Sequence, residues 1–216
     1  TPSLYDVMLG RRRVKEIRRQ VAESLWVVPG NVDLAGVERE LVGEGHETVL
    51  RQALVELELA CRLDYCIVDC PPSLGVLTIN ALAGVREVFI TLQPHFLALQ
   101  GLSKLLETTA LVSRRLNREL KVSGVVLCLF ETGTRLAADI SEDLAAFFAS
   151  SDAQAPWAAA TIFESRIRRN IRLAEAAGFG KSIFDYDPNC NGAADYGRLV
   201  DEVIAGESAV GLTRAA

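Results

Sequence analysis

The chain is poor in the residues that build metal sites and disulfide frameworks. It has 216 residues, five of them cysteine and only two histidine. The cysteine number is odd and no Cys-x-x-Cys pair occurs, which argues against a disulfide framework and a zinc site. His46 and His95 are too isolated for a zinc site or an obvious catalytic triad, and a plain loop position is the simpler interpretation of His95.

Long apolar runs are also missing. None approaches the roughly 20 residues that a membrane helix needs, and the opening TPSLYDVML does not resemble a signal peptide. These absences favour a protein of the reducing cytoplasm that has no membrane contact. The net charge is −5, from 23 basic and 28 acidic residues. A nucleic-acid footprint over the whole chain is therefore excluded, and any DNA contact must come from a local patch.

What is present is enough apolar sequence for a large core. Half of the residues are hydrophobic, and the length suits one large domain. Continuous apolar runs predict strands at 25–28, 65–68, 87–92, 122–130 and 158–163. Helical spacing predicts helices at 4–10, 11–21, 33–41, 50–61, 73–82, 102–116, 136–147, 167–177 and 196–203. Buried strands that alternate with amphipathic helices predict an α/β fold with a mostly parallel sheet and helices on both faces. We expect a single domain over residues 1–205 and a loose tail over 206–216.

The rest of the chain is organised around residues 63–84. An apolar run ends there in Asp69, and Pro71 and Pro72 then stop the predicted strand. Ser73 is placed to cap the helix that follows, while Cys66 and Cys70 are predicted to be small buried hydrophobes. A carboxylate at the carboxyl end of a buried strand lies where open α/β sheets bind ligands, and it commonly holds hydrated Mg²⁺ beside phosphates. For an isolated aspartate, a turn-capping role would be the favoured alternative.

Asp-x-Pro-Pro-Ser, followed by Leu-Thr-x-Asn-Ala-Leu at 77–82, resembles the Walker B and switch II region of the ParA/Soj partition ATPases. These belong to the MinD/ParA group of deviant P-loop ATPases. Further segments similar to the family lie at 29–36, 93–102, 169–176 and 192–199. The resemblance implies that Asp69 is the catalytic residue that serves Mg²⁺ through water, and that Pro71, Pro72 and Ser73 form a segment that responds to the nucleotide. ATP and Mg²⁺ are the cofactors it implies.

The family's first βαβ unit, with its Lys-Gly-Gly-x-Gly-Lys-Thr loop, is absent from these 216 residues. That loop supplies the backbone N–H groups and lysines that hold the phosphates. The stretch Gly-Phe-Gly-Lys-Ser at 178–182 imitates it, but Glu175 stands where the motif requires glycine, and the stretch closes a helix. We therefore expect the chain as given to bind ATP poorly.

Four arginines, at positions 166, 168, 169 and 172, fall within seven residues. Arginines on one helix face can hold DNA phosphates, or they can pair with acidic neighbours such as Glu164 and Glu175, and the sequence favours neither. The resemblance implies that Arg172 belongs to a patch for nonspecific DNA binding. A second family arginine aligns with Gly133, and Arg135 is the candidate replacement. The predicted DNA-binding residues are thus Arg135, Arg168, Arg169 and Arg172.

The resemblance implies a partition ATPase of chromosomes or plasmids. Such a protein forms a homodimer with ATP, binds DNA nonspecifically in association with the nucleoid, and hydrolyses ATP on contact with a ParB-like partner. One alternative is a non-catalytic interaction protein on a truncated P-loop fold. Another is a MinD-like positioning ATPase, which ranks lower because residues 207–216 do not read as an amphipathic membrane helix.

Overall fold

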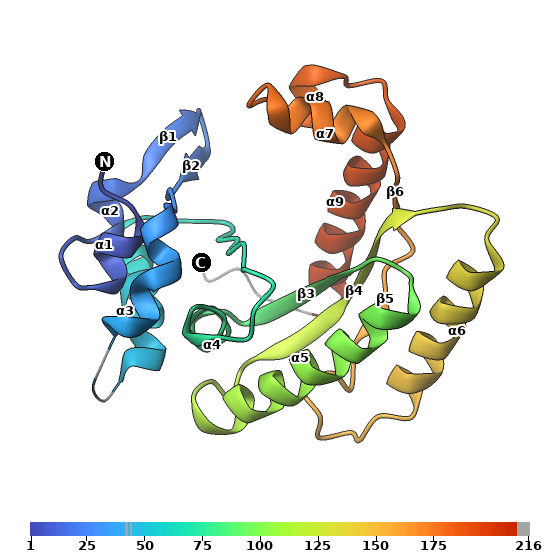
Figure 1. The fold of residues 1–216 in the computed structure, drawn as a ribbon, viewed down its shortest axis with the longest axis horizontal. Helices are drawn as coiled ribbons and strands as arrows, with labels where there is room; N and C mark the ends of the chain where they lie inside the picture. The colour runs from blue at the N-terminus through green and yellow to red at the C-terminus, as the bar shows by residue number, and fades with distance from the viewer. Residues whose placement is uncertain (42, 44, 211–216) are drawn as a thin grey trace. The chain divides into compact units, whose positions relative to one another are not determined.

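The computed structural model describes residues 1–41, 43 and 45–210, and its elements fall into two units (Figure 1). The N-terminal unit comprises Thr1–Arg86 and Leu105–Lys121, and the C-terminal unit comprises Glu87–Lys104 and Val122–Ala216. Helix α5 (Phe96–Arg115) contributes to both. Within the described residues, no helix is both long and apolar enough to cross a membrane.

The N-terminal unit is built mainly from helices. In chain order its other elements are α1 (Leu4–Met8), α2 (Val14–Ile17), β1 (Arg19–Ala22), β2 (Leu25–Val27), the 3-10 helices η1 (Val32–Arg39) and η2 (His46–Thr48), α3 (Val49–Ala60) and α4 (Val76–Gly84). Strands β1 and β2 form an antiparallel hairpin. Helix α3 packs on α4, and Met8, Val37, Leu50 and Ala81 form a buried cluster between the elements. This cluster fixes the position of α4, the helix that follows Asp69.

The C-terminal unit is built around one long strand. Its elements are β3 (Glu87–Leu92), β4 (Lys121–Phe130), α6 (Arg135–Ala149), β5 (Thr161–Ile162), β6 (Ile167–Arg168), α7 (Ile171–Gly178), α8 (Ile183–Tyr186) and α9 (Asn191–Val210). In Figure 1, β4 lies between β3 and β5, and it pairs in parallel with both β5 and β6. The predicted α/β class with a parallel sheet is confirmed, although helices make up most of the N-terminal unit.

The middle of strand β4 is apolar because it runs through the core of this unit. Val125 and Leu127 are fully buried, and Val126 packs with Phe163 and Ile167. Gly124 is required by close packing, since a Cβ there would lie 2.6 Å from the Thr161 carbonyl oxygen. The side chains of α9 close the same core, with Leu199 and Val203 packed against it.

The predicted strands at 87–92 and 122–130, and the helices at 50–61, 102–116 and 136–147, are confirmed within a few residues. Two predicted helices are wrong in part. Residues 11–21 contain only the short α2 before the chain turns into β1, where the β-branched Val21 extends the strand. Residues 167–177 begin with β6, because Ile167 pairs with Cys128 of β4 before α7 starts.

The predicted strand at 65–68 is also wrong, because the described chain is extended there without forming a strand of either sheet. Ile67 is consequently 91% exposed. Cys66 and Cys70 are exposed rather than buried, for the same reason. Of the tail predicted for 206–216, residues up to Val210 lie in α9 and residues 211–216 lie outside the described part.

Candidate functional site

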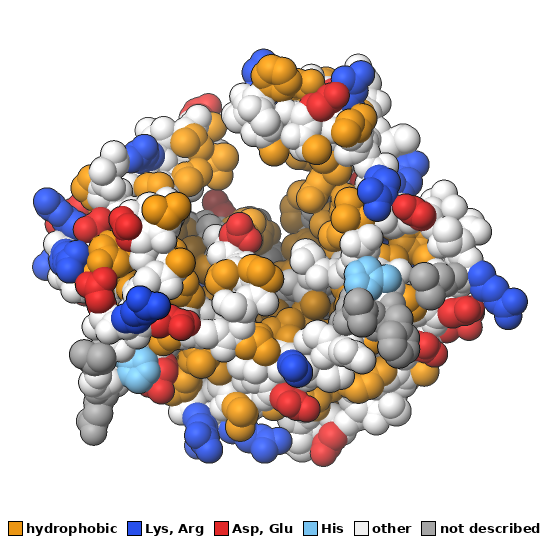
Figure 2. Space-filling view, viewed as in Figure 1, with side chains coloured by type: hydrophobic (Ala, Val, Ile, Leu, Met, Phe, Trp, Pro, Cys, Tyr) orange, Lys and Arg blue, Asp and Glu red, His pale blue; other side chains and the backbone are white. Residues whose placement is uncertain are grey.

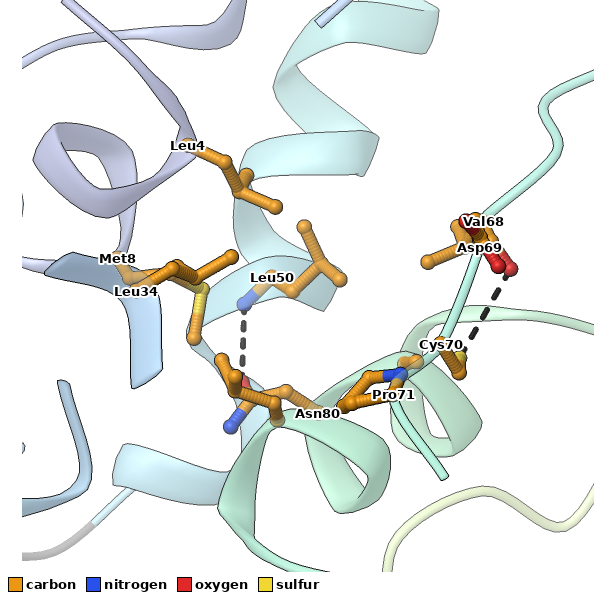
Figure 3. A pocket seen from close by; sticks show the side chains of 11 residues that line it. Leu4, Met8, Leu34, Leu50, Val68, Asp69, Cys70, Pro71 and Asn80 are labelled. Atoms are coloured by element: carbon orange, nitrogen blue, oxygen red, sulfur yellow. Dashed lines mark hydrogen bonds between the residues drawn. The ribbon is translucent and has the colours of Figure 1, made fainter. Parts of the chain in front are cut away.

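Asp69 lies on an extended segment beside the start of α4, within the N-terminal unit. Figure 3 shows Val68, Asp69 and Pro71 on this segment, opposite Leu4 and Met8 of α1. The Asp69 carboxylate is exposed, as are Pro71, Pro72 and Ser73. All four predicted residues therefore lie in one exposed stretch of the chain.

The hollow beside Asp69 is small. It holds about 40 Å³ and is lined mainly by apolar side chains such as Leu34, Leu50 and Leu77. That volume accommodates one or two water molecules but no nucleotide. Phosphates would therefore have to lie on the open side of Asp69.

Helix α4 is anchored by polar side chains at its first turns. Asn80 is fully buried, and its amide binds three backbone groups: it accepts from the Leu50 N–H at 3.1 Å and donates to the carbonyl oxygens of His46 and Val76. Glu38 of η1 accepts from the Val76 N–H at 2.8 Å, where its negative charge suits a helix N-terminus. The cap predicted at Ser73 is wrong, because the N-cap position of the helix is Gly75, and the Ser73 carbonyl oxygen accepts from the Thr78 hydroxyl.

The implied cofactors fit this site in part. A single exposed carboxylate suits hydrated Mg²⁺, which keeps several of its waters, and Asp69 is the residue that would hold it. Among the described residues, no group of three or more histidine, cysteine, aspartate or glutamate side chains could hold a metal directly. The described residues that line the hollow with Asp69 are mainly apolar, and they include no lysine or arginine that could hold a phosphate.

Residues 178–182 are a helix end and not a phosphate loop. Gly178 is the last residue of α7, and Gly180 has a φ of +62°, the left-handed conformation that commonly ends helices. The N–H groups of Gly180 and Lys181 donate to the carbonyl oxygens of Ala177 and Ala176. They are therefore not available to an anion, and the interpretation as a helix end is confirmed.

Arg168 is bound to a buried carboxylate of α9. Its guanidinium contacts both oxygens of Asp195, at 2.7–3.2 Å, and its backbone N–H donates to the same side chain. Asp195 is fully buried and also accepts from Arg198. Burial alone would raise the pKa of Asp195, but the hydrogen bonds and charge of Arg168 outweigh it and hold that pKa below its usual value. Arg168 thus ties β6 to α9.

Arg169 and Arg172 are paired at the surface. Arg169 contacts Glu131 at 3.1 Å, and Arg172 contacts Glu175 at 2.8 Å and Asp187 at 3.5 Å. The hydrogen bond and charge of Glu175 raise the pKa of Arg172. Both arginine side chains remain half exposed or more. Exposed pairs are weak in water, so phosphates could compete for these two arginines.

Among the described residues, basic side chains lie beside acidic ones in each unit as seen in Figure 2. Arg135 at the start of α6 is 95% exposed and 3.9 Å from Asp139. Arg166, which the predicted DNA-binding set omits, lies in the same hollow of the C-terminal unit as Arg135. The one feature of the sequence that pointed to Arg166 was its place in the cluster of arginines at 166–172.

Comparison with known proteins finds a matching family model and several similar partition proteins. A family model described as an AAA domain matches residues 1–122. The chromosome-partitioning ATPase Soj of Treponema pallidum is 35% identical over 94% of this chain and 76% of its own length. The chromosome partitioning protein ParA of Myxococcus xanthus is 38% identical over 94% of this chain and 69% of its own. Soj of Bacillus subtilis, a sporulation initiation inhibitor protein, is 38% identical over 94% and 76%.

Solved structures agree on the fold. A putative plasmid partition protein of Borrelia burgdorferi bound to AMPPNP superposes with a TM-score of 0.69, covering 94% of this chain and 74% of that one, at 18% identity. A structure described as cobyrinic acid a,c-diamide synthase of Mycobacterium smegmatis, with bound ATP analogue and magnesium, gives 0.62 at 35% identity over 67% and 59%. The first likeness concerns the fold alone.

Proposed function

Because the chain belongs to the ParA/Soj family of partition ATPases, we propose that it acts in the segregation of chromosomes or plasmids. One observation carries the proposal: identity of 35–38% to partition proteins extends over 94% of the chain. The proposed activity is ATP hydrolysis coupled to reversible dimerisation and to nonspecific DNA binding on the nucleoid. A ParB-like protein is the proposed partner that stimulates hydrolysis.

Asp69 is the proposed magnesium residue. Its exposed carboxylate would hold waters of the ion, and the ion would neutralise charge on the transferred phosphoryl group. Pro71, Pro72 and Ser73 connect Asp69 to α4, whose first turn is held by Glu38 and Asn80. This connection supports a switch role, because the exposed segment that carries Asp69 leads within a few residues into the anchored first turn of α4.

The proposal requires a phosphate cradle in addition to these residues. The family's Lys-Gly-Gly-x-Gly-Lys-Thr loop does not occur within the 216 residues. We therefore propose ATP hydrolysis only for a version of the protein that carries this loop. A non-catalytic interaction protein is the outcome that remains if that version is inactive.

The test is the Asp69→Ala variant in the loop-carrying version. We expect Mg²⁺-dependent ATP hydrolysis to fall by at least about a hundredfold, because the metal loses its protein anchor, with an unchanged circular-dichroism spectrum. Asp64→Ala is the matched control, since it removes a carboxylate from the same exposed segment. Equal turnover in wild type and Asp69→Ala would remove Asp69 from the mechanism.

A further inference from the structure

Helix α4 receives its N-terminal cap from a distant part of the chain. A helix is commonly capped by the side chain of its own N-cap residue. The N-cap residue of α4 is Gly75, which makes no side-chain cap. The acceptor is instead Oε1 of Glu38 in η1, which lies 38 positions before the Val76 N–H that it binds at 2.8 Å. The first turn of α4 therefore depends on a side chain of η1.

The approach of Glu38 requires a glycine at position 75. A Cβ on that residue would lie 2.0 Å from Oε1 of Glu38 and 3.2 Å from its Cδ. The backbone at Gly75 is extended, with a φ of −81° and a ψ of −170°, so its conformation alone does not demand glycine. The obstacle to a larger residue is thus the carboxylate, which is the end of a flexible side chain and can be displaced.

The support of this contact is fixed, whereas the contact itself can be released. Val37, the neighbour of Glu38, is fully buried in one cluster with Ala81 of α4. Glu38 is exposed, so water competes for its hydrogen bond. Asn80 is buried and anchors a later turn of α4. The first turn can therefore be held or released while the rest of the helix keeps its anchor.

The segment that leads into this turn carries Asp69, as Figure 3 shows. Residues 69–74 are exposed, and the Ser73 carbonyl oxygen accepts from the Thr78 hydroxyl of α4. The end of the segment is thus tied to the first turn of the helix. Fixing that turn shortens the free length of chain around Asp69. Fewer arrangements of the carboxylate are then lost when it takes its place beside a hydrated ion.

From these contacts we infer that Glu38 is a positioning residue for Asp69. It does not contact the ion or the phosphates in this role, and it acts through Gly75 and the Val76 N–H. The inference rests on the proposed function and adds a residue to its magnesium site. Gly75 is the matching half of the contact, because only glycine admits the carboxylate of Glu38.

The first test is amide hydrogen exchange, followed by NMR on the 216-residue chain without nucleotide. Glu38→Ala should speed exchange of the Val76 amide about fivefold, the effect of losing one cap. Glu38→Gln should restore slow exchange, because its amide oxygen still accepts. Gly75→Ala should match Glu38→Ala, and the double variant should exchange no faster than either, because both changes remove the same contact.

The matched control for these variants is Glu40→Ala. Glu40 lies two positions after Glu38, and its carboxylate accepts from the Tyr5 hydroxyl at 2.6 Å instead of from α4. Its loss should leave exchange of the Val76 amide within about twofold of wild type. An unchanged Val76 amide in Glu38→Ala would overturn the inference, because the contact would then not hold the first turn.

The second test measures ATP hydrolysis by the loop-carrying version at increasing Mg²⁺ concentration. Glu38→Ala should raise the Mg²⁺ concentration for half-maximal rate about fivefold, and should change kcat at saturating Mg²⁺ by less than about twofold. Glu40→Ala should change neither. A general loss of stability would not produce this split between the two quantities.

The outcomes separate the inference from the proposed function. If wild type hydrolyses ATP and Glu38→Ala has the same Mg²⁺ dependence, Glu38 is only a helix cap, and the inference fails while the function stands. If the loop-carrying wild type does not hydrolyse ATP, the proposed function fails and the role of Glu38 toward Asp69 fails with it. Faster exchange of the Val76 amide together with a raised Mg²⁺ requirement supports both.

Discussion

At the scale of single residues, the arginines of one cluster differ by their partners. Arg168 meets a carboxylate that is fully buried, Arg172 meets two at the surface, and Arg166 meets none among the described residues. A buried carboxylate must be paired, since an isolated charge inside a protein is costly. Asp195 therefore requires Arg168 as its partner, so Arg168 has a structural role that the surface pairs of Arg172 do not have.

Asp195→Asn should destabilise the C-terminal unit. The amide keeps the shape of the carboxylate but loses its charge and places an N–H₂ among the donors of Arg168 and Arg198. We expect the free energy of unfolding at pH 7 to fall by about 1–3 kcal/mol. Urea denaturation of wild type and variant measures it.

The same pair predicts a pH dependence. The pKa of Asp195 in the folded protein lies below its usual value of 3.8. A lowered carboxyl pKa stabilises the fold above the unfolded pKa, and that stability is lost as the pH falls through the folded pKa. The difference between wild type and Asp195→Asn should thus be complete above about pH 5 and shrink below about pH 4. A difference that stays constant down to pH 3 would contradict the assignment.

How far the sequence predicts these sites depends on the distance between partners. Glu175 was foreseeable as a partner of Arg172, because the two lie three positions apart on one helix. Asp195 lies 27 positions from Arg168, and Glu131 lies 38 from Arg169. Such pairs exist only after the strands and helices pack. The contacts of Arg166 with Phe130 and Ser141 could not be predicted from the sequence either, because these residues also lie far from it along the chain.

At the scale of elements, the strands confirmed are those whose neighbours lie in the described chain. Strand β4 has neighbours on both edges and was predicted within one residue. Residues 65–68 also have an apolar pattern, but they belong to neither of the described sheets and stay extended without forming a strand. An apolar pattern predicts that a segment is able to form a strand, while pairing with a neighbouring strand decides whether it forms one.

Helix α4 depends on Asn80 for its place in the N-terminal unit. Asn80→Ala removes an amide that binds three backbone groups and leaves the Leu50 N–H without its acceptor in a buried site. We expect a loss of about 1–3 kcal/mol in the free energy of unfolding. Asn189→Ala, at an exposed turn, should change it by less than about 0.5 kcal/mol. Equal small effects of both substitutions, measured by urea denaturation, would show that Asn80 is not an anchor.

At the scale of the whole molecule, the proposed nucleotide site needs Asp69 and its segment together with the family's phosphate loop, which does not occur within these 216 residues. Asp69 and the proline segment lie in the N-terminal unit, where the neighbouring hollow holds only about 40 Å³. The phosphates of ATP carry several charges and require loop amides and lysine. Asp69 contributes only through Mg²⁺ and water, so these 216 residues should not hold ATP by themselves.

Calorimetry with Mg·ATP tests this requirement most directly, on the 216-residue chain and on the version that carries the family's phosphate loop. We expect no heat of binding for the 216-residue chain, together with a folded circular-dichroism spectrum, and saturable binding for the version that carries the loop. A dissociation constant in the micromolar range or tighter for the 216-residue chain would contradict this expectation, because the described residues would then contain a phosphate site away from the loop. Absence of binding by both would contradict the proposed ATPase.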